Sequence, residues 1–336
     1  MTSKNMSLKL KPQPFLLQPV CKQTLWGGSL LTKEYGKHAD FDNIAESWEC
    51  STHPDGISTV ASGAFCGQKL SQVLQVHPEY VGSHPHTVGE LPILIKFIDA
   101  ERNLSIQVHP DDDYALKHEN SLGKTEMWYI VKATPGAQLI YGFNNDVNKE
   151  IISAALANDS IMKYLRKISV NTGDTFFIEA GTVHGIGAGN LLVEVQESSN
   201  ITYRMYDYNR VDDSGKKREL HLNKALSVAS FKSSNNPRQP MHIIKYSQGC
   251  AREFLHRCQY FQVEKVMINT KGMGKGIKFA ADSLSFLVLI CTNGYGRMCL
   301  TNGSVIAINQ GNTVFFPANS QTVDVYGEME MLLVRC

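Results

Sequence analysis

The chain has 336 residues and a formal net charge of +1, with 43% hydrophobic and 19% charged residues. This composition is typical of a folded globular protein, and it excludes a disordered chain or a polybasic protein that binds nucleic acid or anionic membranes. None of the eight cysteines lies in a C-x-x-C motif, and the polar N-terminus lacks the apolar core of a signal peptide. No window approaches the roughly 18 apolar residues of a membrane-spanning helix. We therefore expect a cytoplasmic protein with reduced thiols, no nucleic-acid or membrane partner, and a monomeric or weakly homo-oligomeric state.

The first 90 residues predict short strands and one helix. A strand is expected in Pro14–Val20 (PFLLQPV), followed by the turn-rich segment TLWGGSLL. The alternation in Ala45–Ser51 (AESWECS) predicts a second strand, with Glu46 and Trp48 on one face. Residues 68–80 have apolar side chains at helical spacing and a proline near their end, which predicts one surface helix.

Most of the remaining chain predicts β-structure. From Leu91 onward, apolar runs such as PILIKFIDA, EMWYIVKA and LLVEVQE are separated by turn residues, which favours a sandwich or barrel of antiparallel strands. Two helical segments interrupt this pattern: residues 148–167, as one bent helix or two short ones, and residues 220–230. The polar, proline-bearing segment SSNNPRQP then predicts a boundary between a first domain, residues 1–236, and a second domain, residues 237–336.

A weak internal repeat relates the two predicted domains. The segment GDTFFIEAGTVH from Gly173 resembles GNTVFFPANSQT from Gly311, an offset of 138 residues. The strand WYIV at Trp128 resembles FLVL at Phe286, an offset of 158 residues. The difference of 20 residues is about the length of the helical stretch at 148–167. Only the first copy is therefore expected to carry a helical insertion.

Four side chains with metal-binding atoms are candidates for one site. Gln107 and His109 lie two residues apart in the apolar run LSIQVHP, so on a strand they point to the same face. Glu126 opens the run EMWYIV, where an unpaired carboxylate would be costly to bury, and His184 ends AGTVH. Each alone could be an ordinary structural residue, but together they suit a borderline divalent ion, with Zn²⁺ as first choice. The second repeat has Thr322 in place of His184 and lacks the other three.

The segment from Gly173 to His184 matches the second half of a cupin motif, G-x5-P-x-G-x2-H, with Glu179 at the usual proline position. The two glycines allow tight turns at the strand ends. With the repeat, this motif predicts a mainly β fold of two cupin or jelly-roll β-barrel lobes. The N-terminal, metal-binding lobe would carry the helical insertion, and the degenerate C-terminal lobe would lack metal ligands.

Several longer segments together resemble the type I mannose-6-phosphate isomerases in their short bacterial form: SIQVHP, KTEMWY, GTVHGIG, LLVEVQESSN, ITYRMYDYNR, AESWECSTHP and the earlier WGG. The resemblance runs from about Leu16 to Arg210, and the stretch from His184 to Arg204 is one residue longer than in the long form of the family. It implies a zinc-dependent aldose-ketose isomerase that interconverts D-mannose 6-phosphate and D-fructose 6-phosphate through an enediol. The residues that it implies are the zinc ligands Gln107, His109, Glu126 and His184, the catalytic residues Arg204, Glu194 and Lys124, and the substrate contacts Arg210, Ser105 and Glu46.

Residues of these types could support such a reaction. Moving a proton between C1 and C2 of a sugar requires a base and cationic stabilisation of the developing oxyanion. We rank Glu194 first as the base, then Lys124 as a neutral amine, then a zinc-bound water. Arg204 would stabilise the enediolate, and Arg210, together with Lys124, would bind the 6-phosphate.

Two alternatives belong to other functional classes. An iron-dependent cupin dioxygenase would use the same barrel, because a fold does not fix a function. The combination of Gln107, Lys124 and Arg204 argues against it. A non-catalytic sugar-binding cupin describes the C-terminal lobe taken alone, but the complete ligand set of the first lobe argues against it. Without the family resemblance, Arg204 and Arg210 would be interpreted as ordinary surface salt bridges.

Overall fold

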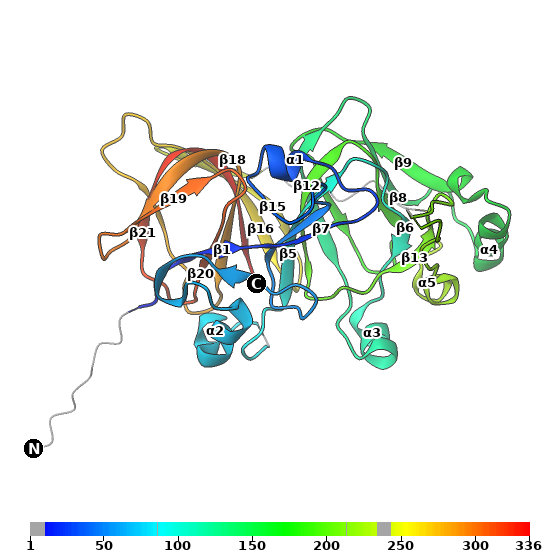
Figure 1. The fold of residues 1–336 in the computed structure, drawn as a ribbon, viewed down its shortest axis with the longest axis horizontal. Coiled ribbons are helices and arrows are strands. Elements are labelled where there is room, and N and C mark those ends of the chain that lie inside the picture. Colours follow the sequence, from blue (N-terminus) through cyan, green and yellow to red (C-terminus); the bar gives the residue numbers. More distant parts are fainter. Residues whose placement is uncertain (1–10, 86, 213, 234–242) are drawn as a thin grey trace, which may run out of the picture.

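The computed structural model describes residues 11–85, 87–212, 214–233 and 243–336. These residues form two β-rich lobes that lie side by side, with most of the helices at the periphery (Figure 1). The prediction of a mainly β fold with two jelly-roll lobes is confirmed. Within the described ranges, no helix combines the length and the apolar character needed to cross a membrane.

The N-terminal lobe is built from a six-stranded and a five-stranded sheet. Their strands are β2 (Val20–Lys22), β3 (Glu46–Cys50), β5 (Ile93–Ala100), β6 (Ile106–Val108), β7 (Glu126–Ala133), β8 (Gln138–Phe143), β9 (Leu165–Ser169), β10 (Thr175–Ile178), β11 (His184–Ile186), β12 (Asn190–Glu197) and β13 (Tyr203–Tyr206). The six-stranded sheet has the order β10-β7-β12-β5-β3-β2, and the five-stranded sheet has the order β13-β6-β11-β8-β9. Buried apolar side chains from both sheets, among them Trp128, Leu139, Ile186 and Leu192, form one core cluster.

The C-terminal lobe contains a ten-stranded sheet to which the start of the chain contributes. Its strands are β1 (Phe15–Gln18), β4 (Thr59–Val60), β14 (Ile244–Ser247), β15 (Cys250–Arg257), β16 (Gln262–Asn269), β17 (Ile277–Phe279), β18 (Leu287–Cys299), β19 (Val305–Asn309), β20 (Thr313–Phe316) and β21 (Val323–Arg335). The main path is β14-β15-β16-β21-β18-β20-β1-β4. Phe15 of β1 lies opposite Phe315 of β20, and Figure 1 shows β1 in blue against this lobe.

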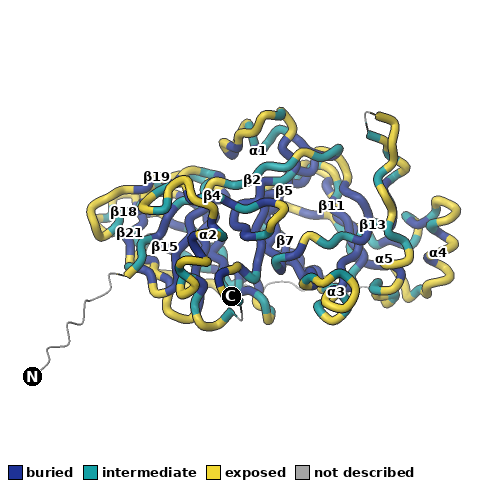
Figure 2. The backbone as a smooth tube through the Cα atoms, turned by 60° about the horizontal axis from the view of Figure 1, so that its bottom comes forward, coloured by how far each residue is buried: buried dark blue, intermediate teal, exposed yellow. Residues whose placement is uncertain are grey.

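The C-terminal lobe therefore includes two strands from the start of the chain, β1 and β4, whereas the two sheets of the N-terminal lobe contain no strand from residues 243–336. The boundary predicted at residue 236 lies outside the described residues, and the division into domains 1–236 and 237–336 stays a proposal. Figure 2 shows buried segments in both lobes, whereas many of the peripheral loops are exposed.

Five short α-helices accompany the sheets: α1 (Leu30–Lys33), α2 (Leu70–Val76), α3 (Asp112–Glu119), α4 (Lys149–Ala157) and α5 (Leu222–Val228). Three 3₁₀ turns lie at η1 (Gly63–Phe65), η2 (Pro78–Tyr80) and η3 (Ile161–Lys163). Helix α2 confirms the helix expected within residues 68–80, and its Leu70, Val73 and Leu74 are buried. Helix α5 confirms the helix expected at 220–230, although it is shorter at both ends.

The helical insertion predicted at residues 148–167 is only half helical. Helix α4 ends at Ala157, and Asp159 then adopts a left-handed backbone conformation with φ of 60°, which a continuing helix does not allow. After η3 the chain forms β9, whose residues pair with β8. The apolar spacing that suggested helix therefore belongs to a helix followed by an edge strand.

The repeat is visible in the strand pairing. Strand β7 pairs with β10 and β12 in the first lobe, as β18 pairs with β20 and β21 in the second. Gly173 and Gly311, which open the repeated motif, both have left-handed φ values, 92° and 86°. Thr175 lies opposite Tyr129 and Thr313 opposite Ile290, so pairing relates β7 to β18 by 290 − 129 = 161 residues. This is three more than the offset of 158 expected from sequence.

Candidate active site and metal centre

Three buried side chains meet inside the N-terminal lobe. His109 directly follows β6, Glu126 is the first residue of β7, and His184 is the first residue of β11. Their relative exposures are 1%, 0% and 0%. One possible ligand atom of each lies within 4.8 Å of the others. The structure therefore brings together the two imidazoles and the carboxylate that the sequence predicted as metal ligands.

Both imidazoles are oriented by backbone carbonyls. His109 Nδ1 lies 2.7 Å from the carbonyl oxygen of Ile201, and His184 Nδ1 lies 2.8 Å from that of Thr182. Because a carbonyl oxygen can only accept, each Nδ1 donates and each Nε2 presents a lone pair to the site. Burial lowers the pKa of His184 to about 4, and it lowers that of His109 well below its ordinary value. Neutral imidazole is the form that binds a metal.

Glu126 adds a carboxylate to the two imidazoles of His109 and His184, and these three groups could bind a cation. Its Oε1 is buried, has no hydrogen-bond partner among the described residues, and lies 3.3 Å from Nε2 of His184. Burial, followed by the charge of Glu194, raises the pKa of Glu126 to about 7. On the other side, the ammonium of Lys124 contacts Glu126 and lies 3.2 Å from Nε2 of His109. Since lone pairs from both imidazoles and the carboxylate converge, the donor set fits a divalent metal ion.

Gln107, the fourth predicted ligand, lies beside this group. It is opposite His184 in the pairing of β6 with β11. Its Nε2 is 3.3 Å from His184 Nε2, while its Oε1 accepts a hydrogen bond from Ser105 Oγ at 3.3 Å. A half-turn of the amide group would exchange these two atoms and present the oxygen to the metal ligands. The role of Gln107 as a ligand stays a prediction.

Alternating acidic and basic side chains form a second buried group. Oε1 of Glu194 lies 3.2 Å from Nζ of Lys96 and 3.6 Å from Nζ of Lys124, and Lys96 lies 3.5 Å from Glu46. Burial alone would raise the pKa of Glu194, but Lys124 and Lys96 outweigh it and lower the pKa to about 2. Burial alone would lower the pKa of Lys96, but Glu46 and Glu194 raise it above its ordinary value. Glu194 and Lys96 are therefore ionised and paired with each other.

Strand register places Glu194 and Lys96 side by side, with a tryptophan on the next strand at each end of the row. Glu194 on β12 lies opposite Lys96 on β5 and opposite Trp128 on β7, and Lys96 lies opposite Trp48 on β3. The indole of Trp128 donates a hydrogen bond to Glu194 at 2.9 Å, and that of Trp48 donates to Glu46 at 2.7 Å. Each carboxylate is thus fixed by a rigid aromatic donor as well as by an ammonium group.

A pocket of about 330 Å³ connects the two buried groups to the surface of the lobe. Among its lining residues are six of the predicted site residues: Glu46, Ser105, Gln107, Lys124, Glu194 and Arg204. His109, Glu126 and His184 do not line it, but they contact Gln107 or Lys124, which do.

Arg210 is the predicted site residue that lies apart from this pocket. It is not among the lining residues, and its guanidinium contacts Asp207 and the carbonyl oxygen of Asn103. Arg204, in contrast, lines the pocket. Its Nη1 donates to the carbonyl oxygen of Glu219 at 2.8 Å, while its buried Nε has no hydrogen-bond partner.

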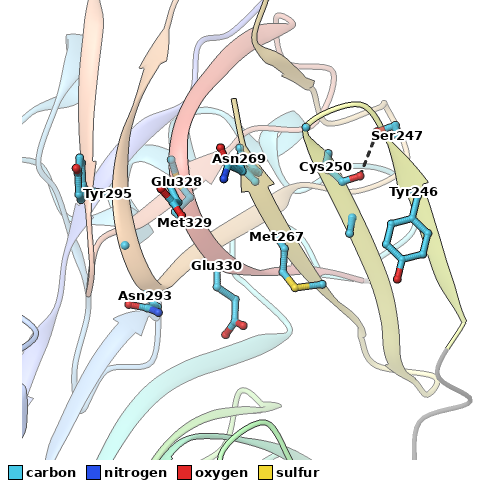
Figure 3. Close-up of a pocket in the computed structure, with 14 residues that line it drawn as sticks. Tyr246, Ser247, Cys250, Met267, Asn269, Asn293, Tyr295, Glu328, Met329 and Glu330 are labelled. Atoms are coloured by element: carbon cyan, nitrogen blue, oxygen red, sulfur yellow. Dashed lines mark hydrogen bonds between the residues drawn. The ribbon is translucent and has the colours of Figure 1, made fainter. Parts of the chain in front are cut away.

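A larger pocket of about 640 Å³ lies on the C-terminal sheet and holds none of the predicted site residues. Figure 3 shows Tyr246, Met267, Asn293 and Glu330 among the residues that line it. Size alone therefore does not identify the functional pocket of this protein.

Two charged pocket residues were missed by sequence reasoning. Lys96 interrupts the apolar run PILIKFI, and a lone lysine in a strand that is buried on both faces must find an anionic partner. That pattern could have identified it. Arg218 belongs to the basic run KKR in a surface segment, where nothing in the local sequence distinguishes it from its neighbours.

The chain is similar to known proteins over nearly its whole length. The sequence model described as phosphomannose isomerase type I, catalytic domain, matches residues 15–131. The chain is 34% identical over 321 residues to the mannose-6-phosphate isomerase of Streptococcus mutans, a match that covers 95% of this chain and 97% of the relative. It is also 34% identical over 328 residues to the probable mannose-6-phosphate isomerase GmuF of Bacillus subtilis, covering 95% and 98%. The crystal structure of the mannose 6-phosphate isomerase from Bacillus subtilis matches with a TM-score of 0.87 at 30% identity, covering 96% of this chain and 99% of that one. The chain therefore belongs to the type I mannose-6-phosphate isomerase family.

Proposed function

We propose that this chain interconverts D-mannose 6-phosphate and D-fructose 6-phosphate and that it uses one bound Zn²⁺ per chain. The observation that carries this proposal is the convergence of His109, Glu126 and His184 next to a pocket lined by paired lysines and carboxylates. The relatives named mannose-6-phosphate isomerase support the choice of substrate.

The metal would be held by Gln107, His109, Glu126 and His184. Two neutral imidazoles, a carboxylate and an amide oxygen suit a borderline ion such as Zn²⁺ better than they suit a hard ion such as Mg²⁺ or Ca²⁺. When bound, such an ion supplies Lewis-acid polarisation of the sugar oxygens. The carbonyl groups of Ile201 and Thr182 fix both imidazole rings before any ion arrives.

Glu194 remains our first choice for the base that moves a proton between C1 and C2. Lys124 and Lys96 lower the pKa of Glu194 to about 2, and a carboxylate with so low a pKa is a weak base. Its role as the base therefore requires that its pKa rise when substrate binds. Sugar hydroxyl groups that accept hydrogen bonds from the two ammonium groups would loosen these ion pairs. The carboxylate would then gain basicity only when substrate fills the pocket.

Positive charge for the developing enediolate would come from the pocket wall. Arg204 lines the pocket and has one guanidinium nitrogen, Nε, that is buried without a hydrogen-bond partner. Lys96 and Lys124 are fixed by their carboxylate partners, so little reorganisation is needed as charge develops on the substrate oxygen.

The first test combines metal analysis of the purified protein with a coupled assay of mannose 6-phosphate conversion. We expect about one zinc per chain, loss of activity with a chelator and recovery with added Zn²⁺. His109→Ala removes one ligand and should lower both the zinc content and kcat/KM, the latter by at least about 100-fold.

The exposed His38 offers a matched control, because His38→Ala removes an imidazole far from the predicted ligands in sequence. This variant should keep both zinc and activity. Undiminished turnover by metal-free His109→Ala protein would refute the proposed role of the metal. Sugar-phosphate binding without any turnover by the zinc-loaded parent protein would refute the proposed reaction.

A further inference from the structure

One buried carboxylate, Asp207, binds two arginines beside the active-site pocket. Arg218 donates from Nε to Oδ2 at 2.8 Å and from Nη2 to Oδ1 at 2.6 Å, while Nη2 of Arg210 also contacts Oδ1. The side chain of Asp207 is 5% exposed, against 18% for Arg210 and 23% for Arg218. Asp207 is thus the fixed centre of this cluster.

The cluster carries more positive charge than Asp207 can balance. Arg204 lies near both other arginines, and burial followed by the charge of Arg218 lowers the pKa of Arg204. The charge of Glu219 raises the pKa of Arg204, but Glu219 is exposed. Arg204 donates its hydrogen bond to the backbone carbonyl oxygen of Glu219 and not to the carboxylate. Among the described residues, Arg210 and Arg218 share the carboxylate of Asp207, while Arg204, which lines the pocket with Arg218, has no ion pair with it. An anion in the pocket would relieve this imbalance.

Arg218 and Arg210 differ in what they can offer to a ligand. Arg218 lines the pocket, and Asp207 engages two of its three guanidinium nitrogens, so that no described residue bonds to Nη1. In Arg210 every guanidinium nitrogen already donates to Asp207 or to the carbonyl oxygen of Asn103. Among the described residues, each terminal nitrogen of Arg210 keeps one free N–H group, but Arg210 does not line the pocket, whereas both N–H groups of Nη1 of Arg218 are free for a phosphate in it.

We propose that Arg218 binds the phosphate group of the substrate, and that Asp207 and Arg210 are positioning residues that hold Arg218 in place. Phosphate oxygens match the planar fork of a guanidinium group, which makes arginine suitable for this task. The inference rests on the proposed function, and it assigns the direct phosphate contact to Arg218 instead of Arg210.

Arg210 also links this cluster to the metal-binding strand. Its Nη1 donates to the carbonyl oxygen of Asn103, four residues before Gln107. The side chain of Asn103 in turn accepts a hydrogen bond from the backbone of Ala188 at 2.8 Å. Loss of Arg210 should therefore weaken phosphate binding indirectly, and by less than loss of Arg218.

The test measures inorganic phosphate binding by calorimetry, and kcat and KM for mannose 6-phosphate, on the zinc-loaded full chain. Arg218→Gln should weaken phosphate binding and raise KM about 10- to 100-fold, with a smaller change in kcat, because a charge-assisted contact is lost. Arg218→Lys keeps the charge but loses the fork held by Asp207, so its effect should be intermediate. This variant also keeps the test decisive if Arg218→Gln folds poorly.

Arg257→Gln is the matched control, because it removes an exposed arginine of the C-terminal lobe. It should leave phosphate binding and both kinetic constants unchanged. For the positioning role, Asp207→Asn should weaken phosphate binding in the parent protein but add little to Arg218→Gln. Additive losses in the double variant would overturn that role.

The inference is overturned if Arg210→Gln weakens phosphate binding more than Arg218→Gln does, if Arg218→Gln behaves like the control, or if the parent protein does not bind phosphate. Failure of the proposed function gives a different result. In that case the parent protein would bind phosphate through Arg218 but would not convert mannose 6-phosphate.

Discussion

Lys96 illustrates what could be predicted for single residues of the site and what could not. The metal ligands follow from local motifs, since two-residue spacing on a strand fixes the relative direction of Gln107 and His109. Lys96 depends on strand register instead: it acquires Glu194 and Glu46 as partners because β5 lies between β12 and β3. Its own sequence shows only that a partner is required. Arg218 lacked even that signal, because its partner Asp207 lies eleven residues away across an irregular segment.

The paired state of Glu194 predicts how Lys96→Met should behave. Removal of this ammonium leaves Glu194 with Lys124 as its nearest cation, so the pKa of Glu194 should rise. If Glu194 is the base, it is active when deprotonated, and the acid limb of the kcat/KM profile should move to higher pH. Because a buried ion pair is broken, the free energy of unfolding should also fall by about 3–5 kcal/mol. Activity between pH 4 and pH 9, together with urea unfolding, tests both effects.

Lys132→Met is the control for this change, because Lys132 is half exposed and pairs with Glu34 at the surface. It should alter the unfolding free energy by less than about 1 kcal/mol and leave the pH profile in place. An acid limb that stays where it is in Lys96→Met would count against Glu194 as the base.

At the scale of elements, prediction succeeded where the local signal was complete. Helix α4 begins at an asparagine cap, since Asn148 Oδ1 accepts a hydrogen bond from the backbone of Ile151 at 2.8 Å. Its end was misjudged because Leu165, the last apolar position of the predicted segment, fits a helical period as well as the buried face of a strand. Only the pairing of β9 with β8, a contact across the insertion, decides between these two interpretations. The strand at Phe15–Gln18 was expected, but its partner β20 lies nearly 300 residues away in sequence, beyond the reach of any local pattern.

The cap of α4 gives a prediction for that helix. Asn148→Ala removes the side-chain acceptor and should lower the free energy of unfolding by about 1 kcal/mol. The helix contributes no residue to the active-site pocket, so kcat and KM for mannose 6-phosphate should not change. Ser153→Ala, at an exposed position within the same helix, is the control and should be neutral or slightly stabilising. Equal stability of the two variants in urea would show that the cap contributes nothing.

In the whole molecule, the two lobes are joined by a common apolar core and by a buried ion pair. One apolar cluster combines Phe97 and Val193 of the first lobe with Phe286 and Val334 of the second. Beside it lies a buried ion pair, in which Lys37 Nζ is 2.7 Å from Glu49 Oε1. Together with β1, which joins the sheet of the second lobe, these contacts mean that the lobe with the predicted metal ligands is folded against the second copy of the repeat. We infer that the second lobe serves as a scaffold for β3 and β5, which carry Glu46 and Lys96.

The ion pair provides the sharpest test of this scaffold role. Glu49 is fully buried on β3, and it accepts hydrogen bonds from Ser47 at 2.6 Å and from Thr313, in the other lobe, at 2.8 Å. Lys37 also donates to the carbonyl oxygen of Gly311. Glu49→Gln leaves the buried ammonium without its anion, so the free energy of unfolding should fall by about 3–5 kcal/mol. Replacing both partners, Lys37→Met with Glu49→Met, should recover much of that loss, because no charge then remains buried.

Because Trp26, Trp48 and Trp128 all belong to the first lobe, urea unfolding is followed by hydrogen exchange of β18 in the second lobe and by loss of activity. If the ion pair joins the lobes into one cooperative unit, Glu49→Gln should lower the midpoints of both signals together. Lys278→Met breaks a pair with Asp324 that is exposed and lies within the second lobe, so it should cost less than about 1 kcal/mol. A cost for Glu49→Gln no larger than this control would contradict the scaffold role. Separation of the two signals in the parent protein would show that the lobes unfold independently, although β1 from the start of the chain belongs to the sheet of the second lobe.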